Sequence, residues 1–174
     1  MFSKKGKAFP IIITVIIIVI IIYLFVNVKQ PLVVCDKTVK DELGITISEN
    51  LETTLDGSKI KSMTLTKTII LPENYLEDDS YLESIMFALE KSYAYLEDAE
   101  VSITKTKDRV VSKIYIDDDE TIILNNIQFF YNDELQIKIN SNTKSSEVVT
   151  LRINDNYTEG ELMTRLKNNG YSCM

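Results

Sequence analysis

The feature that most constrains the fold is an uncharged apolar stretch near the N-terminus, which runs from Phe9 to Val26 and contains nine isoleucines. At about 1.5 Å per residue, a helix of these 18 residues is roughly 27 Å long, close to the ~30 Å hydrocarbon core of a bilayer. Isoleucine lowers helix propensity in water, but in lipid the backbone must hydrogen-bond to itself. We therefore predict a transmembrane helix over residues 9–28, with the lipid bilayer as its partner.

The lysines on either side of this stretch predict its orientation. Lys4, Lys5 and Lys7 precede it, whereas only Lys29 follows directly. The positive-inside rule then makes residues 1–8 a cytoplasmic basic tail and places the C-terminal bulk outside the cell membrane. No small residues follow the stretch at the positions that a signal peptidase needs, so we predict an uncleaved, single-pass signal anchor.

The composition excludes several kinds of chemistry. The chain has 174 residues with no His and only two Cys, so histidine catalysis, His-metal sites and four-Cys zinc sites are excluded. There are 19 basic and 26 acidic residues, for a net charge of −7, which argues against a nucleic-acid partner. Without the three lysines of the tail, 16 basic residues face 26 acidic ones, giving −10 outside. We expect no cofactor and no metal.

Beyond the anchor, residues 29–40 are predicted to form a tether and a first short strand, and residues 41–174 an extracytoplasmic α+β domain. Between residues 45 and 71, apolar side chains recur at odd positions on both sides of an Asp-Gly-Ser-Lys turn at 56–59. This spacing is typical of a β-hairpin with one buried face. Pro72 ends the second strand.

The rest of the domain alternates helix and strand signals. Ser80 and Glu83 have the spacing of a capping box, and an apolar stripe continues from there to Leu96, which predicts a helix packed on the sheet. Thr158 and Glu161 form a second such pair, predicting a short C-terminal helix. The remaining predictions are a hairpin over 101–116 and strands over 121–126, 129–139 and 148–153. The predicted fold is thus an antiparallel sheet with one packed helix and a short C-terminal helix.

The two cysteines lie at opposite ends of the predicted outer domain, Cys35 at its start and Cys173 at its end. In an oxidising compartment they would form a disulfide that ties the ends of the domain together. Two unpaired thiols are the alternative. A catalytic dithiol is not expected, because the chain has no Cys-x-x-Cys and no His to activate a thiolate.

The order of these features resembles that of a known family. Cys35-Asp-Lys-Thr38 leads into Thr-rich paired strands around Asp-Gly-Ser-Lys, then a Tyr- and Glu-rich helix, a hairpin, and a short helix that ends in Gly-Tyr-x-Cys at Cys173. This layout resembles the YehR-like (DUF1307) lipoproteins of low-GC Gram-positive bacteria. The resemblance implies an extracytoplasmic α+β domain without an established activity. The chain lacks a lipobox before Cys35, so lipid attachment is not carried over.

Three functions remain open on the sequence alone. The favoured one is a non-enzymatic binding or structural module of the cell envelope, with an unknown protein or envelope partner. A pilin-like or secretion-apparatus subunit is the second, since Gly6 precedes an apolar helix, although that helix lacks the usual glutamate. The third is a small hydrolase using carboxylates, although no spacing in the sequence singles out a catalytic pair. We predict no catalytic residue.

Overall fold

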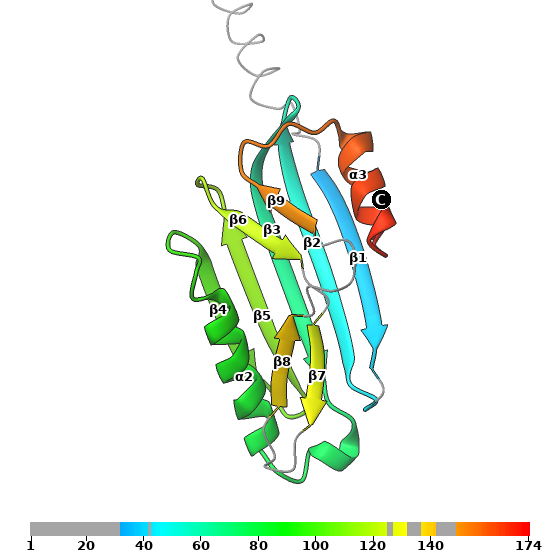
Figure 1. The fold of residues 1–174 in the computed structure, drawn as a ribbon, viewed down its shortest axis with the longest axis vertical. Helices are drawn as coiled ribbons and strands as arrows, with labels where there is room; N and C mark the ends of the chain where they lie inside the picture. The colour runs from blue at the N-terminus through cyan, green and yellow to red at the C-terminus, as the bar shows by residue number, and fades with distance from the viewer. Residues whose placement is uncertain (1–31, 42, 125–126, 132–136, 142–148) are drawn as a thin grey trace, which may run out of the picture. The chain divides into compact units, whose positions relative to one another are not determined.

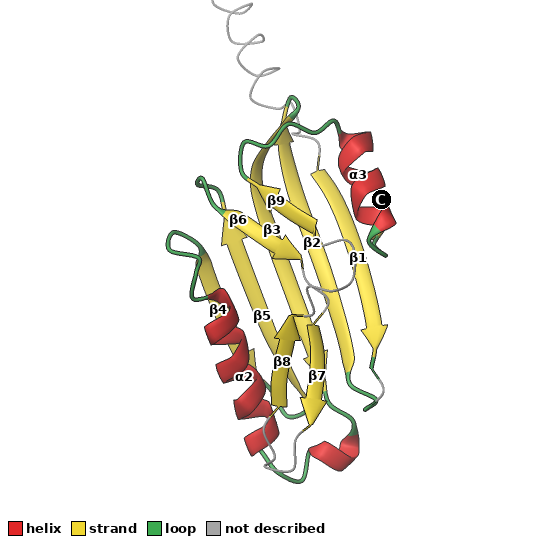
Figure 2. Ribbon diagram, viewed as in Figure 1, coloured by secondary structure: helices red, strands yellow, loops and turns green. Residues whose placement is uncertain are grey.

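A computed structural model describes residues 32–41, 43–124, 127–131, 137–141 and 149–174. They form an α+β fold whose largest element is a six-stranded antiparallel sheet, with helices over one of its faces (Figures 1 and 2). The α+β class, the antiparallel sheet and the two helices expected from the sequence are therefore confirmed.

The predicted transmembrane helix, residues 9–28, lies outside the described residues. In the part of the chain that the structure describes, no helix has the length and apolar character needed to cross a membrane.

The strand order of the main sheet is β10-β1-β2-β3-β5-β4. Its strands are β1 (Leu32–Lys40), β2 (Thr46–Asp56), β3 (Lys59–Ile70), β4 (Glu100–Lys105), β5 (Arg109–Ile116) and β10 (Ser172–Cys173). The first three strands follow one another as a meander, and β5 then pairs with β3 while β4 takes the edge. The predicted hairpin over 45–71 is confirmed, and its turn needs Gly57, whose φ of 62° lies in the left-handed region.

A short 3₁₀ helix η1 (Glu73–Tyr75) and the helix α2 (Ser80–Tyr93) connect β3 to β4. The apolar stripe of α2 faces the core, and its buried residues are Leu82, Ile85, Leu89 and Tyr93. Leu96 is also buried, as the stripe predicts, but it follows the end of the helix.

The capping box predicted at Ser80 is wrong. The N-cap residue is Asp79, whose side chain makes no capping bond. Asp78 acts in its place, because its Oδ1 accepts the backbone N–H of Ser80 at 2.8 Å. Glu83 does not reach back to the cap, and its Oε1 lies 3.3 Å from the ammonium of Lys105 on β4.

Two antiparallel strand pairs follow. Their strands are β6 (Thr121–Leu124) with β9 (Val149–Arg152), and β7 (Ile127–Tyr131) with β8 (Ile137–Ser141). The strands predicted over 121–126 and 148–153 are confirmed in slightly shorter form. The single strand predicted over 129–139 is wrong, because this stretch contributes to two strands that pair with each other.

The C-terminal helix α3 (Glu159–Asn168) begins at the predicted capping box. The backbone N–H of Thr158 donates to Glu161 Oε2 at 2.9 Å, and the N–H of Glu161 donates to Thr158 Oγ1 at 3.3 Å. Gly170, with φ of 85°, ends the helix and lets the chain turn into β10.

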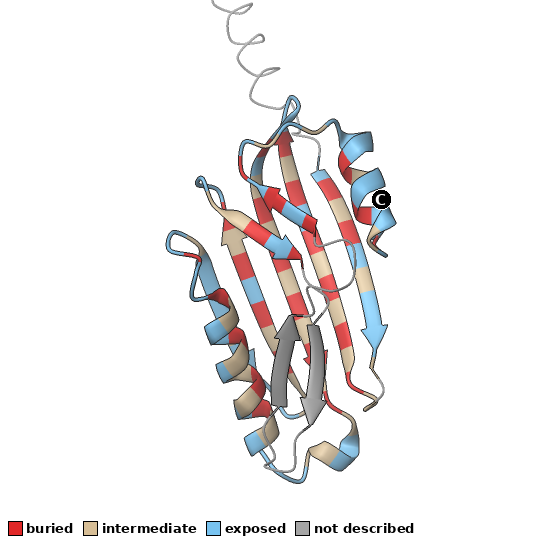
Figure 3. Cartoon of the chain, in the orientation of Figure 1, coloured by how far each residue is buried: buried red, intermediate tan, exposed pale blue. Residues whose placement is uncertain are grey.

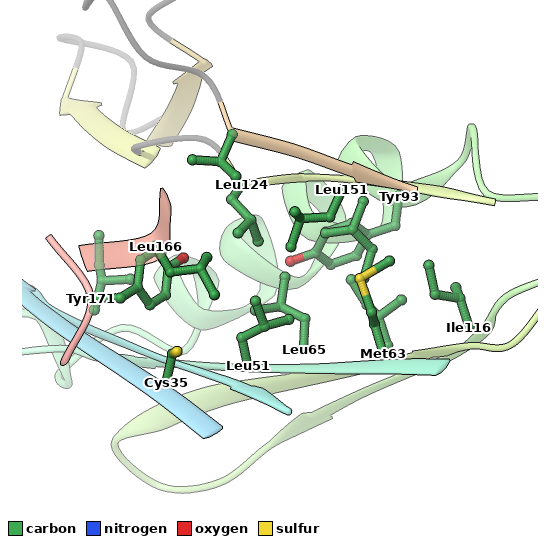
Figure 4. Close-up of a cluster of buried hydrophobic side chains, with 14 of the residues drawn as sticks. Cys35, Leu51, Met63, Leu65, Tyr93, Ile116, Leu124, Leu151, Leu166 and Tyr171 are labelled. Carbon is green, nitrogen blue, oxygen red and sulfur yellow. The ribbon is translucent and has the colours of Figure 1, made fainter. Parts of the chain in front are cut away.

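The hydrophobic core lies between the inner face of the sheet and the elements that cover it (Figures 3 and 4). Along the central strands buried and accessible residues alternate, as expected for an antiparallel sheet with one solvated face. Side chains of β6 and β9 such as Leu124 and Leu151 complete the core from above the sheet, and α3 adds Leu166.

Candidate functional site

A buried ion pair lies inside this apolar core. Glu49 on β2 is directly opposite Lys67 on β3, and the Lys67 ammonium is 2.9 Å from Glu49 Oε1. Their side chains are only 8% and 5% exposed, respectively. A single charge in such a place is strongly unfavourable, so each residue depends on the other.

Tyrosine and serine hydroxyls extend this pair into a network. Tyr171, between α3 and β10, donates its hydroxyl to Glu49 Oε2 at 2.5 Å. Tyr93, at the end of α2, has its hydroxyl 3.3 Å from Ser112 Oγ on β5 and also interacts with Lys67. Figure 4 shows the two tyrosine rings entering the core from these separate elements. We call Glu49, Lys67, Tyr93, Ser112 and Tyr171 the buried polar cluster.

The electrostatics of the buried polar cluster keep Lys67 and Tyr171 protonated. Burial alone lowers the pKa of Lys67, but the combined interactions with Tyr93 and Glu49 outweigh burial and raise that pKa. Burial, followed by the charge of Glu49, raises the pKa of Tyr171 well above its usual range. Lys67 therefore stays an ammonium and Tyr171 a neutral phenol, and neither group is a nucleophile in this state. The cluster joins β2, β3, β5, α2 and the C-terminal segment.

The predicted cysteine pairing is confirmed. Cys35 on β1 lies opposite Cys173 on β10, their Cα atoms are 4.1 Å apart, and they form a disulfide. The backbone N–H of Met174 donates to the carbonyl of Val34 beside it at 3.0 Å. Because Tyr171 is only two residues before Cys173, this disulfide also holds Tyr171 against Glu49.

The opposite face of the main sheet carries small polar side chains. From Thr46 to Thr54 on β2 and from Ser62 to Ile70 on β3, every odd-numbered residue is buried and no even-numbered one is. Seven of these ten even-numbered residues carry a hydroxyl: Thr46, Ser48, Thr54, Ser62, Thr64, Thr66 and Thr68. The helices and strand pairs of the described part of the chain lie over the other face (Figure 1). We call this polar side of the main sheet the open face.

Hydrogen bonds between side chains order parts of the open face. Asn50 on β2 donates to Asp36 Oδ1 on β1 at 2.9 Å, and the hydroxyls of Thr38 and Ser48 are 3.1 Å apart. These are cross-strand pairs in the register of β1 and β2. The face is therefore a pre-arranged set of hydroxyl, amide and carboxylate groups.

A shallow groove lies at the β4 end of the open face. It is lined by Thr64, Glu100, Val101, Ser102, Lys113 and Tyr115. Tyr115 is held in place because its hydroxyl donates to Asp117 Oδ2 at 3.1 Å. Burial, followed by the interaction with Asp117, raises the pKa of Tyr115, so its phenol stays neutral at physiological pH.

The acidic run at 117–120 makes structural contacts. Asp119 forms a bidentate ion pair with Arg152 on β9, with distances of 3.0 and 2.6 Å. Glu120 Oε1 accepts the backbone N–H groups of residues 97 and 98, at 2.9 and 3.1 Å. Among the described residues, no three His, Cys, Asp or Glu side chains gather in a way that could hold a metal ion.

Sequence reasoning missed the buried polar cluster, although it left a signal. Glu49 and Lys67 occupy inward positions between buried apolar neighbours, so each interrupts the alternation from which the hairpin was predicted. A charged residue at an inward position of each paired strand, with opposite signs, indicates a buried ion pair. Nothing local pointed to Tyr171, which lies 122 residues beyond Glu49.

Comparison of this chain with protein-family models, with curated proteins and with solved structures finds no match.

Proposed function

We propose that this chain is a single-pass membrane-anchored protein whose C-terminal domain is a non-enzymatic binding or structural module outside the cytoplasm. In this proposal, residues 9–28 span the bilayer, residues 1–8 stay in the cytoplasm, and the open face is the surface that the domain presents to its partner.

The observation that carries the proposal is the disulfide between Cys35 and Cys173. Disulfides form and persist in oxidising compartments and are rare in the cytosol. A compartment outside the membrane agrees with the orientation that the tail lysines predict. The disulfide joins the two ends of the domain, and Cys35 lies within ten residues of the end of the predicted transmembrane span. This position suits a module held at the membrane surface.

The distribution of polar groups favours binding over catalysis. Glu49 and Lys67 are charged residues that are buried in the core, and they form an ion pair with each other. The accessible polar groups are instead spread over the open face, where hydroxyls predominate. A broad and ordered polar surface that no described element covers suits recognition of a partner through many weak hydrogen bonds.

Cysteine labelling in intact cells tests the location. A membrane-impermeant maleimide is added before and after treatment with a reductant that does not cross the membrane. We expect labelling only after external reduction, with Cys173 reacting first because Cys35 is fully buried. The matched control is Cys35→Ala/Cys173→Ala, which takes no label under any condition.

Two results would contradict the proposal. Labelling of intact cells without reduction would show free thiols and exclude the disulfide. Labelling only after lysis, with no reductant needed, would place the domain in the cytoplasm.

A further inference from the structure

The groove around Tyr115 has the chemistry of a small ligand site on the open face. Tyr115 on β5 is directly opposite Glu100 on the edge strand β4 and Thr64 on β3. In the next row across the sheet, Lys113 lies opposite Ser102. An aromatic ring is therefore surrounded by a carboxylate, an ammonium and hydroxyl groups, all on one face.

The charges in and around this groove disfavour anionic ligands. Its lining contains one carboxylate, from Glu100, and one ammonium, from Lys113, and a second carboxylate, from Asp117, accepts the hydroxyl of Tyr115. The chain as a whole is acidic, with a net charge of −7, which repels polyanions. A neutral ligand with many hydrogen-bonding groups avoids this repulsion.

The geometry points to a neutral oligosaccharide as that ligand: we infer that the Tyr115 groove binds a neutral glycan chain. A sugar ring has an apolar C–H face that packs on an aromatic ring such as Tyr115, which is fixed by its bond to Asp117. Its hydroxyls both donate and accept, and they match the hydroxyls of Thr64 and Ser102. Hydrogen bonds from sugar hydroxyls to Glu100 and Lys113 gain strength from the charge on the protein.

The open face would let such a chain continue past the groove. Thr66 lies opposite Lys113 on the next strand, and Thr66 in turn lies opposite Asn50 on β2. Polar side chains thus run across the sheet from the groove, perpendicular to the strands. The inference rests on the proposed function, because a cell-envelope module meets glycan chains on the outside of the membrane.

The test is binding to the full-length protein in nanodiscs, whose lipids carry no sugar. Saturation-transfer NMR is recorded with three neutral hexasaccharides, cellohexaose, maltohexaose and chitohexaose, each at about millimolar concentration. We expect at least one to bind, and Tyr115→Ala and Lys113→Met each to weaken that binding at least tenfold. The matched control is Tyr95→Ala, since Tyr95 is an exposed tyrosine, 47% accessible, outside the open face.

Three outcomes would overturn the inference. They are binding of none of the three hexasaccharides, binding that Tyr115→Ala leaves unchanged, and preferential binding of an anionic glycan such as a heparin hexasaccharide. Each result can occur while cysteine labelling still places the domain outside the cell, so failure of the ligand assignment is distinguishable from failure of the proposed function. Circular dichroism of each variant verifies that the sheet is intact.

Discussion

Replacing Lys67 by methionine should destabilise the domain strongly, because it leaves Glu49 buried without its counter-ion. Removing one partner of a buried ion pair costs about 3–5 kcal/mol. Glu49 is 8% exposed and keeps one donor, the hydroxyl of Tyr171. We therefore expect Lys67→Met to lower the free energy of unfolding by about 3 kcal/mol, the lower end of that range.

The matched comparison removes the whole ionic arrangement. In Glu49→Leu/Lys67→Met/Tyr171→Phe, neither a charge nor the Tyr171 hydroxyl is left without a partner. Apolar replacement of a buried ion pair is often neutral or stabilising, so this variant should lie within about 1 kcal/mol of the native protein or above it. The contrast separates the penalty of an isolated charge from the net value of the pair.

Hydrogen exchange of the slowest amides of β2 and β3, measured on the oxidised full-length protein in nanodiscs, gives these free energies. The reasoning would be refuted by a Lys67→Met variant that loses less than about 1 kcal/mol. A triple variant as unstable as the single one would refute it equally, because the loss would then not come from the isolated carboxylate.

Three further predictions concern stability. Cys35→Ala/Cys173→Ala should lower the free energy of unfolding by up to about 5 kcal/mol in the chain-entropy model, and reductant should lower the urea midpoint of the native protein but not of this variant. The pKa of Tyr171 is higher in the folded state than in the unfolded state. Its contribution to the free energy of unfolding is therefore complete below the unfolded pKa of about 10, and this contribution is lost as the pH rises above that value. The raised pKa of Lys67 acts in the same direction, and Tyr171→Phe should make the alkaline decrease of the urea midpoint less steep. Thr158→Ala should weaken α3 by about 1 kcal/mol, seen as faster exchange of its first-turn amides only.

Local signals in the sequence predicted the parts of the fold whose contacts are local. The alternation over 45–71 predicted β2 and β3, since the two strands are joined by a short turn and share one register. The box at Thr158 predicted the start of α3, where the Thr158 hydroxyl accepts the N–H of Glu161. At Ser80 the same pattern failed, because Asp78 offered a carboxylate to the helix N-terminus and Lys105 attracted Glu83.

Contacts between distant segments were not predictable from these patterns. The position of β5 between β3 and β4 depends on the crossover through α2, and the stretch 129–139, predicted as one strand, contributes to two. The disulfide was predicted because the chain has only two cysteines and they lie at opposite ends of the predicted outer domain. The bond from Tyr171 to Glu49 depends on the whole fold, since the disulfide and α3 bring its donor to β2.

The central claim is that the open face is uncovered and lies outside the cell, and two neighbouring threonines of β2 test it directly. Thr54 is a partly exposed residue of the open face, whereas Thr53 points into the core with 0% exposure. Each is replaced by cysteine with the native disulfide kept, and intact cells are treated with an impermeant maleimide without reductant. We predict rapid labelling of Thr54→Cys and labelling of Thr53→Cys only after denaturation. A Thr54→Cys protein that is labelled only after the cells are lysed would contradict the claim.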